Sequence, residues 1–194
     1  MQKYLLITII TFGLLIIGCG SKTGPDLSPE ASTKTVKNLP DWYLNTPVND
    51  GYQYAAAEAT SQSMQLAVDK ARVAAVSNLS QMIKSEWNGY TKRVQEETGM
   101  GADSKLLDQF STTQENVISN QLENVIVKEK EIQVENSGGT RIYRTFVLVE
   151  LDENAAQDKL LAQIKADQQL YDAIKASELI DEMEQKVEAY RQRK

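Results

Sequence analysis

The sequence has no histidine among its 194 residues, and this absence excludes several kinds of chemistry. Without an imidazole, neither a Ser-His-Asp nor a Cys-His catalytic arrangement can form. An HExxH zinc site is excluded too, because histidine supplies its ligands and is the side chain that most often binds metals. We therefore expect neither a bound metal nor a cofactor.

Cysteine is almost as scarce, since Cys19 is the only one in the chain. A lone cysteine cannot form a disulfide within its own chain. Glycine-rich phosphate loops are also missing, because Gly99–Gly101 and Gly138–Gly139 stand outside the strand–loop–helix context that such loops need. Thiol redox chemistry and nucleotide phosphate binding are therefore not expected.

The chain has little positive charge in proportion to its acidic residues. Residues 19–194 contain 20 Lys and Arg against 27 Asp and Glu, a net charge of −7. Such an excess disfavours a broad nucleic-acid surface and electrostatic binding to anionic lipid. We expect no nucleic-acid partner.

Carboxylates are the catalytic groups that remain. Asp41 and Glu58 flank a predicted strand, and Glu86 and Asp69 share a predicted helix. Paired carboxylates could act as general acid and base in a hydrolase. With 27 acidic residues in the chain, solvated surface positions explain these four better, and we expect no enzymatic activity.

The N-terminus carries the clearest motif in the sequence. Leu5 to Ile17 is an uncharged apolar run of 13 residues, which as a helix spans roughly 20 Å and is too short for a bilayer core of about 30 Å. Lys3 precedes the run, and Ile16-Ile17-Gly18-Cys19 follows it in a form that resembles a bacterial lipobox. This pattern predicts cleavage between Gly18 and Cys19 and attachment of acyl chains to Cys19, which anchor the protein to a membrane.

The composition divides the chain into four parts. Residues 1–18 are the predicted signal peptide, and 19–38 are the lipidated cysteine with a flexible tether, which would span on the order of 25 Å. Residues 39–152 are a predicted α+β domain, and 153–194 are a predicted long C-terminal helix.

Within the domain, the residue patterns predict a small antiparallel sheet of three to four strands packed on long helices. Tyr52 and Tyr54 are expected on one face of a strand, and a helix is expected from about Thr60 to Thr98, ended by Gly99. The remaining elements are a helix from about Asp103, a hairpin of residues 125–135 and 141–151, and a final helix capped by Asp152 that bends near Ser177.

The last helix carries an apolar stripe formed by Ile180, Met183, Val187 and Tyr190. Either this stripe packs lightly on the domain, or it is a surface for an envelope protein or for a second copy of the chain. The exposed edge of the hairpin is a further candidate contact surface.

The chain resembles the LPP20 family of bacterial envelope lipoproteins. The resemblance covers roughly residues 39–152 and rests on the lipobox, on Leu39-Pro40-Asp41-Trp42-Tyr43, on the Tyr-rich strand before an Ala-rich helix, and on the strand that ends at Leu151-Asp152. The family's glycine after the Tyr-rich strand is replaced here by Ala56 and Ala57. The resemblance implies a small α+β domain without an established enzymatic activity.

Two functional interpretations follow. The preferred one is a non-enzymatic structural or interaction module, held by its lipid in the cell envelope. Gly20 is not the Asp that retains such lipoproteins in the inner membrane of enteric bacteria, so we expect the outer membrane, with the domain facing the periplasm. The alternative is a periplasmic ligand-binding or carboxylate-dependent hydrolytic domain with a cleft formed by Trp42, Tyr52, Tyr54 and nearby carboxylates.

Overall fold

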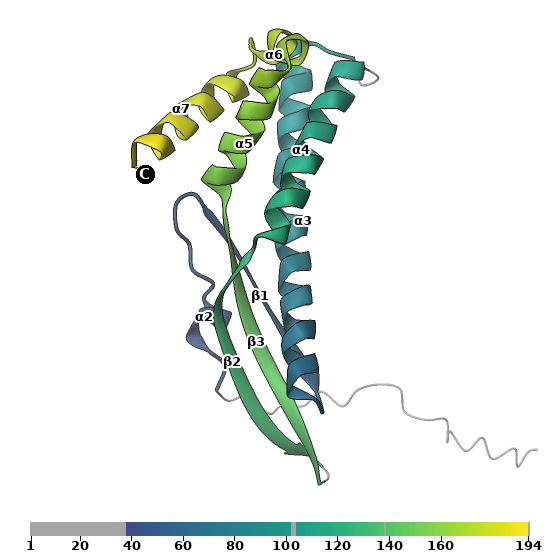
Figure 1. The fold of residues 1–194 in the computed structure, drawn as a ribbon, viewed down its shortest axis with the longest axis vertical. Helices are drawn as coiled ribbons and strands as arrows, with labels where there is room; N and C mark the ends of the chain where they lie inside the picture. Colours follow the sequence, from purple (N-terminus) through teal and green to yellow (C-terminus); the bar gives the residue numbers. More distant parts are fainter. Residues whose placement is uncertain (1–37, 102–103, 138, 194) are drawn as a thin grey trace, which may run out of the picture. The chain divides into compact units, whose positions relative to one another are not determined.

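A computed structural model describes residues 38–101, 104–137 and 139–193 (Figure 1). It confirms the predicted α+β class, with a three-stranded antiparallel sheet and, among the described residues, six helices. In chain order the elements are α2 (Asp41–Leu44), β1 (Tyr52–Ser61), α3 (Met64–Thr98), α4 (Lys105–Glu123), β2 (Ile126–Ser137), β3 (Thr140–Asp152), α5 (Glu153–Ala166), α6 (Gln168–Ile174) and α7 (Glu178–Arg193). The predicted signal peptide, its cleavage site at Gly18, the lipidated Cys19 and most of the tether lie outside the described residues.

The sheet has the strand order β1-β3-β2, so the predicted hairpin and the central position of its second strand are confirmed. The strand predicted around Tyr52 and Tyr54 continues to Ser61, because Thr60 and Ser61 still pair with Arg144 and Tyr143 of β3. The next helix therefore begins later than expected. Its N-cap is Ser63, whose side chain accepts the Leu66 N–H at 3.4 Å.

Helix α3 covers one face of the sheet and extends past it into the helical part of the molecule (Figure 1). Its buried side chains recur every fourth residue, at Ala67, Ala71, Ala75, Leu79, Ile83 and Trp87. A step of four residues turns about 40° beyond a full helical turn, so the buried direction rotates along the helix. The alanines face the sheet, whereas Trp87 and Val94 belong to the part of the core that the other helices complete.

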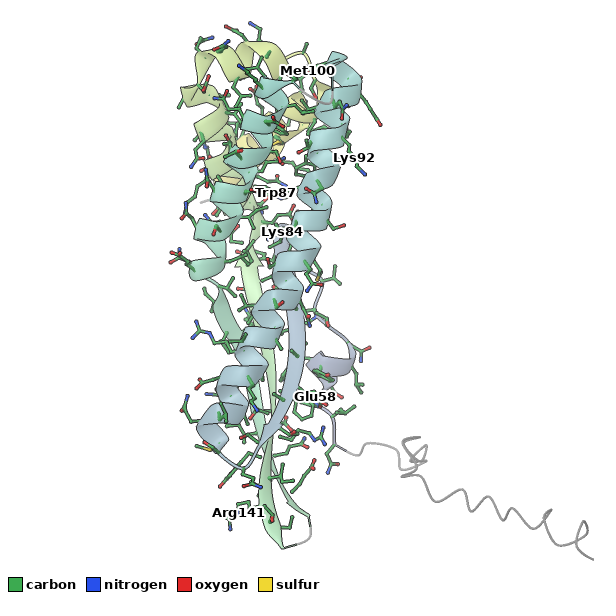
Figure 2. All side chains as sticks on the ribbon, turned by 90° about the vertical axis from the view of Figure 1, so that its right-hand side faces the viewer. Glu58, Lys84, Trp87, Lys92, Met100 and Arg141 are labelled. Carbon is green, nitrogen blue, oxygen red and sulfur yellow. The ribbon has the colours of Figure 1, made fainter. Side chains whose placement is uncertain are left out.

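The far end of α3 stops where the sequence predicts. Gly99 has the left-handed φ of 70°, and its N–H donates to the Gln95 carbonyl. Figure 2 shows Met100 at this end and Arg141 near the tip of the hairpin, at the opposite end of the fold. Helix α4 then runs back along α3, and Phe110 and Val117 on α4 join the same core.

The C-terminal region is helical as predicted, but it forms three helices and not one long helix. The first break is at Asp167, which is extended and whose side chain caps α6 by accepting the Leu170 N–H at 2.9 Å. The second break lies before α7, close to the bend expected at Ser177. Buried Ser177 donates to the Glu97 carboxylate of α3, which also accepts the Leu179 N–H at 3.3 Å.

The apolar stripe of α7 packs inside the molecule. Ile180, Met183 and Val187 are each no more than 2% exposed, and the Tyr190 hydroxyl donates to Asp152 at 3.0 Å. The prediction of a partner surface on this stripe is therefore wrong, and the alternative that the helix packs on its own domain is observed. The hydrophobic effect explains this outcome, since Ile180 and Met183 join the main core and Val187 is buried as well, where α7 packs on α5 and α3.

The sheet face opposite α3 is covered by the segment that leads into the domain. Tyr43 of α2 packs on Phe146 of β3 with ring centroids 4.9 Å apart, and Leu148 beside it is fully buried. Trp42 is half-buried and makes an edge contact with Tyr43. In the described part of the chain, no helix has the length and apolar character needed to cross a bilayer.

Candidate functional site

The carboxylates singled out in the sequence do not meet in one site. Asp41 is exposed at the start of α2, and Glu58 accepts from Arg144 at 3.0 Å on the outer sheet face. Asp69 is exposed on α3, where it accepts from Gln65 at 2.9 Å. Asp41, Glu58 and Asp69 are exposed, in agreement with the preferred interpretation of solvated surface positions, whereas Glu86 is half-buried.

The predicted aromatic cleft is also absent from the described residues. Tyr54 is 5% exposed, and its hydroxyl donates to Glu150 at 2.8 Å and accepts from Asn49 at 2.7 Å. Burial raises the pKa of Tyr54, the hydrogen bond from Asn49 acts in the opposite direction, and Glu150 raises the pKa further. Tyr52 is 40% exposed on the same strand face, so these two rings do not enclose a ligand-sized space together.

Glu86 has a different carboxyl partner, Glu153 at the start of α5. The Gln53 amide nitrogen donates to Glu86 at 2.6 Å and to Glu153 at 3.3 Å, so one amide bridges both carboxyl groups. The Tyr90 hydroxyl donates to the other Glu86 oxygen at 2.7 Å. The Gln157 amide nitrogen donates to the other Glu153 oxygen at 2.8 Å and to Tyr90 at 3.3 Å.

These five side chains form a closed ring of hydrogen bonds, which we call the carboxyl ring (Gln53, Glu86, Tyr90, Glu153 and Gln157). The ring joins three elements, because Gln53 comes from β1, Glu86 and Tyr90 from α3, and Glu153 and Gln157 from α5. It lies at the point where α3 passes from the sheet to the helical part, next to Trp87, whose position Figure 2 shows. Trp87 stacks on Tyr90 with centroids 6.3 Å apart.

Local structure explains why Glu153 arrives at this position. Asp152 caps α5 by accepting the Ala155 N–H at 2.9 Å, and the Gly51 carbonyl accepts the Glu153 N–H at 2.9 Å. Gly51 has a φ of 77°, and a Cβ there would overlap the Asn154 side chain. The turn before β1 thus fixes the first turn of α5 beside the sheet.

The electrostatics of the ring favour the protonated form of Glu153. Burial and then the negative charge of Glu86 raise the pKa of Glu153, while the hydrogen bond from Gln53 and, more weakly, the charge of Lys186 act in the opposite direction. Burial and the hydrogen bond to Glu86 raise the pKa of Tyr90, so its phenol stays neutral. All the hydrogen-bond donors in the ring are therefore uncharged groups.

Gln157 is the most deeply buried member of the ring, at 2% exposure. Its amide nitrogen makes two hydrogen bonds, but its Oε1 has no partner within the described structure. The Trp87 Nε1 nearby also lacks an acceptor there. These two unpaired groups lower the free energy of unfolding, because a buried polar atom without a hydrogen-bond partner is destabilising.

One side of the ring borders a cavity of about 230 Å³. Its lining consists of Asp50, Gly51, Glu153, Asn154, Gln157, Lys186 and Ala189. Glu153 thus has a route for proton exchange with solvent, whereas Glu86 does not line this cavity. Chemically, the arrangement can bind, hold and release a proton.

Metal binding receives no support from the described residues. Among them, no three His, Cys, Asp or Glu side chains gather in a way that could hold a metal ion. The carboxyl ring has two carboxyl groups, and their four oxygens already accept hydrogen bonds from protein donors.

Comparison with known proteins gives no match. No family model matches the chain, and no curated protein or solved structure matches it. The resemblance to the envelope lipoprotein family stays a prediction from the residues quoted above.

Proposed function

We propose that this protein is a bacterial lipoprotein, anchored in the cell envelope through Cys19, whose α+β domain is a non-enzymatic structural or interaction module. The observation that carries the proposal is the run Ile16-Ile17-Gly18-Cys19 behind an apolar segment of signal-peptide length. The Gly-, Ser-, Thr- and Pro-rich composition of residues 19–38 supports a tether between lipid and domain. More than one acyl chain would make the anchoring stable.

The arrangement of the domain supports a structural role over a hydrolytic one. The four oxygens of Glu86 and Glu153 accept hydrogen bonds within the carboxyl ring, so neither carboxyl group is oriented toward a substrate. The ring connects β1, α3 and α5 by hydrogen bonds, as a structural polar network does. No observation in the described residues favours the ligand-binding or hydrolytic alternative strongly enough to adopt it.

With the stripe of α7 buried, the outer edge of β2 is the better candidate contact surface. β2 pairs with β3 only, and its Ile126 and Val134 side chains are 61% and 56% exposed. The alternating charges of residues 128–131 and the bulge between Val127 and Glu129 are features that keep an edge strand soluble. An envelope protein with complementary charges would be the matching partner.

Intact mass of the protein extracted from its native membranes tests the anchor. We expect a mass that lacks residues 1–18 and carries acyl chains, and we expect Cys19→Ala to lose them. Ser21→Ala is the matched control, because it changes the same segment and leaves the cysteine. An unmodified, soluble mass for the wild-type chain would overturn the proposal.

Membrane fractionation tests the proposed location. We expect the wild-type protein in the outer-membrane fraction, facing the periplasm, and Gly20→Asp in the inner-membrane fraction of an enteric host. Equal distribution of both proteins would show that Gly20 does not direct sorting.

A further inference from the structure

We infer that Glu153 holds a proton in the folded domain beside the Glu86 carboxylate, and that this proton controls how firmly β1, α3 and α5 are joined. The inference goes beyond the proposed function and does not depend on the lipid anchor. It rests on the geometry of the carboxyl ring and on the groups that surround it.

The first argument is the balance of donors in the ring. The Gln53 amide, the Tyr90 hydroxyl and the Gln157 amide offer five hydrogens, and five hydrogen bonds of the ring use them. No ring member is a cation. Two half-buried carboxylates would therefore carry two negative charges against neutral donors alone, which a site of reduced polarity disfavours.

The second argument comes from the charged groups that face the pair. From α3 these are Glu86 and Tyr90, and from α7 Lys186 contributes a positive charge that acts on Glu153 only weakly. From the segment before β1, Asp50 lines the cavity that Glu153 borders and adds a carboxylate to the same region. A proton on Glu153 removes the repulsion between its carboxyl group and the Glu86 carboxylate.

The raised pKa of Glu153 sets the direction of the effect. A carboxyl group whose pKa is higher in the folded than in the unfolded chain stabilises the fold when protonated. This contribution is complete below the ordinary glutamate pKa of about 4.3 and is lost as the pH rises through the folded pKa. The packing of β1, α3 and α5 around the carboxyl ring should thus be more stable at mildly acidic pH and less stable toward alkaline pH.

Thermal unfolding of the full-length protein between pH 5 and pH 9 tests the inference. We expect the wild-type midpoint to fall by several degrees as the pH rises. Glu153→Gln keeps the shape of the side chain and removes one charge, so its midpoint should exceed that of the wild type at pH 8 and change little with pH. Glu86→Gln should behave in the same way, which keeps the test valid if one variant fails to fold.

Glu188→Gln is the matched control, because Glu188 is an exposed carboxylate on α7 that pairs with Gln192 at 3.0 Å. It should follow the wild-type pH profile. A wild-type midpoint that is constant from pH 5 to pH 9 would overturn the inference. So would Gln variants that keep the wild-type slope, since the slope would then belong to other groups.

Discussion

Both halves of α3 bury apolar side chains, but the second half also carries a network of half-buried polar side chains. The first half, residues 64–83, presents Ala67, Ala71 and Ala75 to the sheet, and its buried side chains are all apolar. The second half, residues 84–98, contributes Glu86, Tyr90 and Thr91 to polar contacts that sit beside buried Trp87. The contribution of the first half to the free energy of unfolding does not depend on pH. The contribution of the second half depends on the protonation of Glu153 in the carboxyl ring. One helix therefore has a contact region whose stability does not change with pH and another whose stability does.

The largest expected effect is a loss of stability caused by a substitution in the first half of α3. Leu79→Ala would leave a cavity in the main core, where Leu79 is fully buried, and should lower the free energy of unfolding by about 2–5 kcal/mol. Urea unfolding should give this loss equally at pH 5.5 and pH 8, because no titratable group is removed. Met82→Ala, at an exposed position of the same helix, should cost less than about 0.5 kcal/mol. A loss for Leu79→Ala that depends on pH would break the comparison.

A smaller and pH-dependent effect is expected in the second half. Tyr90→Phe removes the donor to Glu86 and should lower the free energy of unfolding by about 1–3 kcal/mol at pH 8. The loss should be smaller at pH 5, because protonation of Glu153 removes the repulsion on Glu86 that the Tyr90 hydrogen bond helps to offset. The same measurement on Tyr171→Phe, whose hydroxyl donates to Glu184 at 3.2 Å, provides the control. Equal losses for Tyr90→Phe at both pH values would contradict the account.

The turn that holds α5 beside the ring can be tested through glycine. Gly51→Ala places a side chain at a φ of 77° and against Asn154, and should destabilise the fold by about 1–2 kcal/mol. Gly89→Ala is the matched change, since Gly89 lies within α3 and no atom lies within 4 Å of its Cβ position. This variant should raise the free energy of unfolding by roughly 0.5–1 kcal/mol. Chemical denaturation of both variants gives the two values, and a neutral Gly51→Ala would show that the turn is not required.

The far end of α3 should respond to pH in the opposite direction from the ring. Hydrogen bonds from Ser177 and then from Arg93 lower the pKa of Glu97, so its contribution is present above about pH 4.5 and is lost as the pH falls through the folded pKa. Glu97→Gln should lower the unfolding midpoint slightly at pH 7 and reduce the acid destabilisation between pH 5 and pH 3. An unchanged acid limb in this variant would assign that destabilisation to other carboxylates.

Local signals in the sequence predicted much of the fold. Gly99 ends α3, Asp152 caps α5, and β2 pairs with β3 up to Ser137 and Thr140, each by an interaction between residues a few positions apart. The break at Asp167 was missed because the aspartate can also continue a helix, and only the packing of α6 decides. The stripe of α7 was identified correctly as apolar, but its amphipathic pattern does not distinguish a domain core from a partner surface.

The candidate site was predictable only in part. Glu86 was named as a candidate together with Asp69 on the same helix, with a solvated surface position as the preferred explanation. In the structure its neighbouring carboxyl group is Glu153, far away along the sequence. Such a pair is created by the packing of α5 beside α3, and no spacing rule within one element encodes it. Gln53 and Gln157 carried no sequence signal, because a glutamine acquires a role here only from its neighbours in space.

Direct titration of the Glu153 carboxyl group is the measurement that tests the central claim most closely. Carbon-13 NMR of the glutamate-labelled protein, with Glu153→Gln to assign the resonance, follows the carboxyl carbon from pH 3 to pH 9. The account predicts a midpoint for Glu153 clearly above the ordinary value of about 4.3, and a change in that midpoint toward the ordinary value in Glu86→Gln. A Glu153 carboxyl group that titrates at the ordinary value in the folded wild-type protein would contradict it.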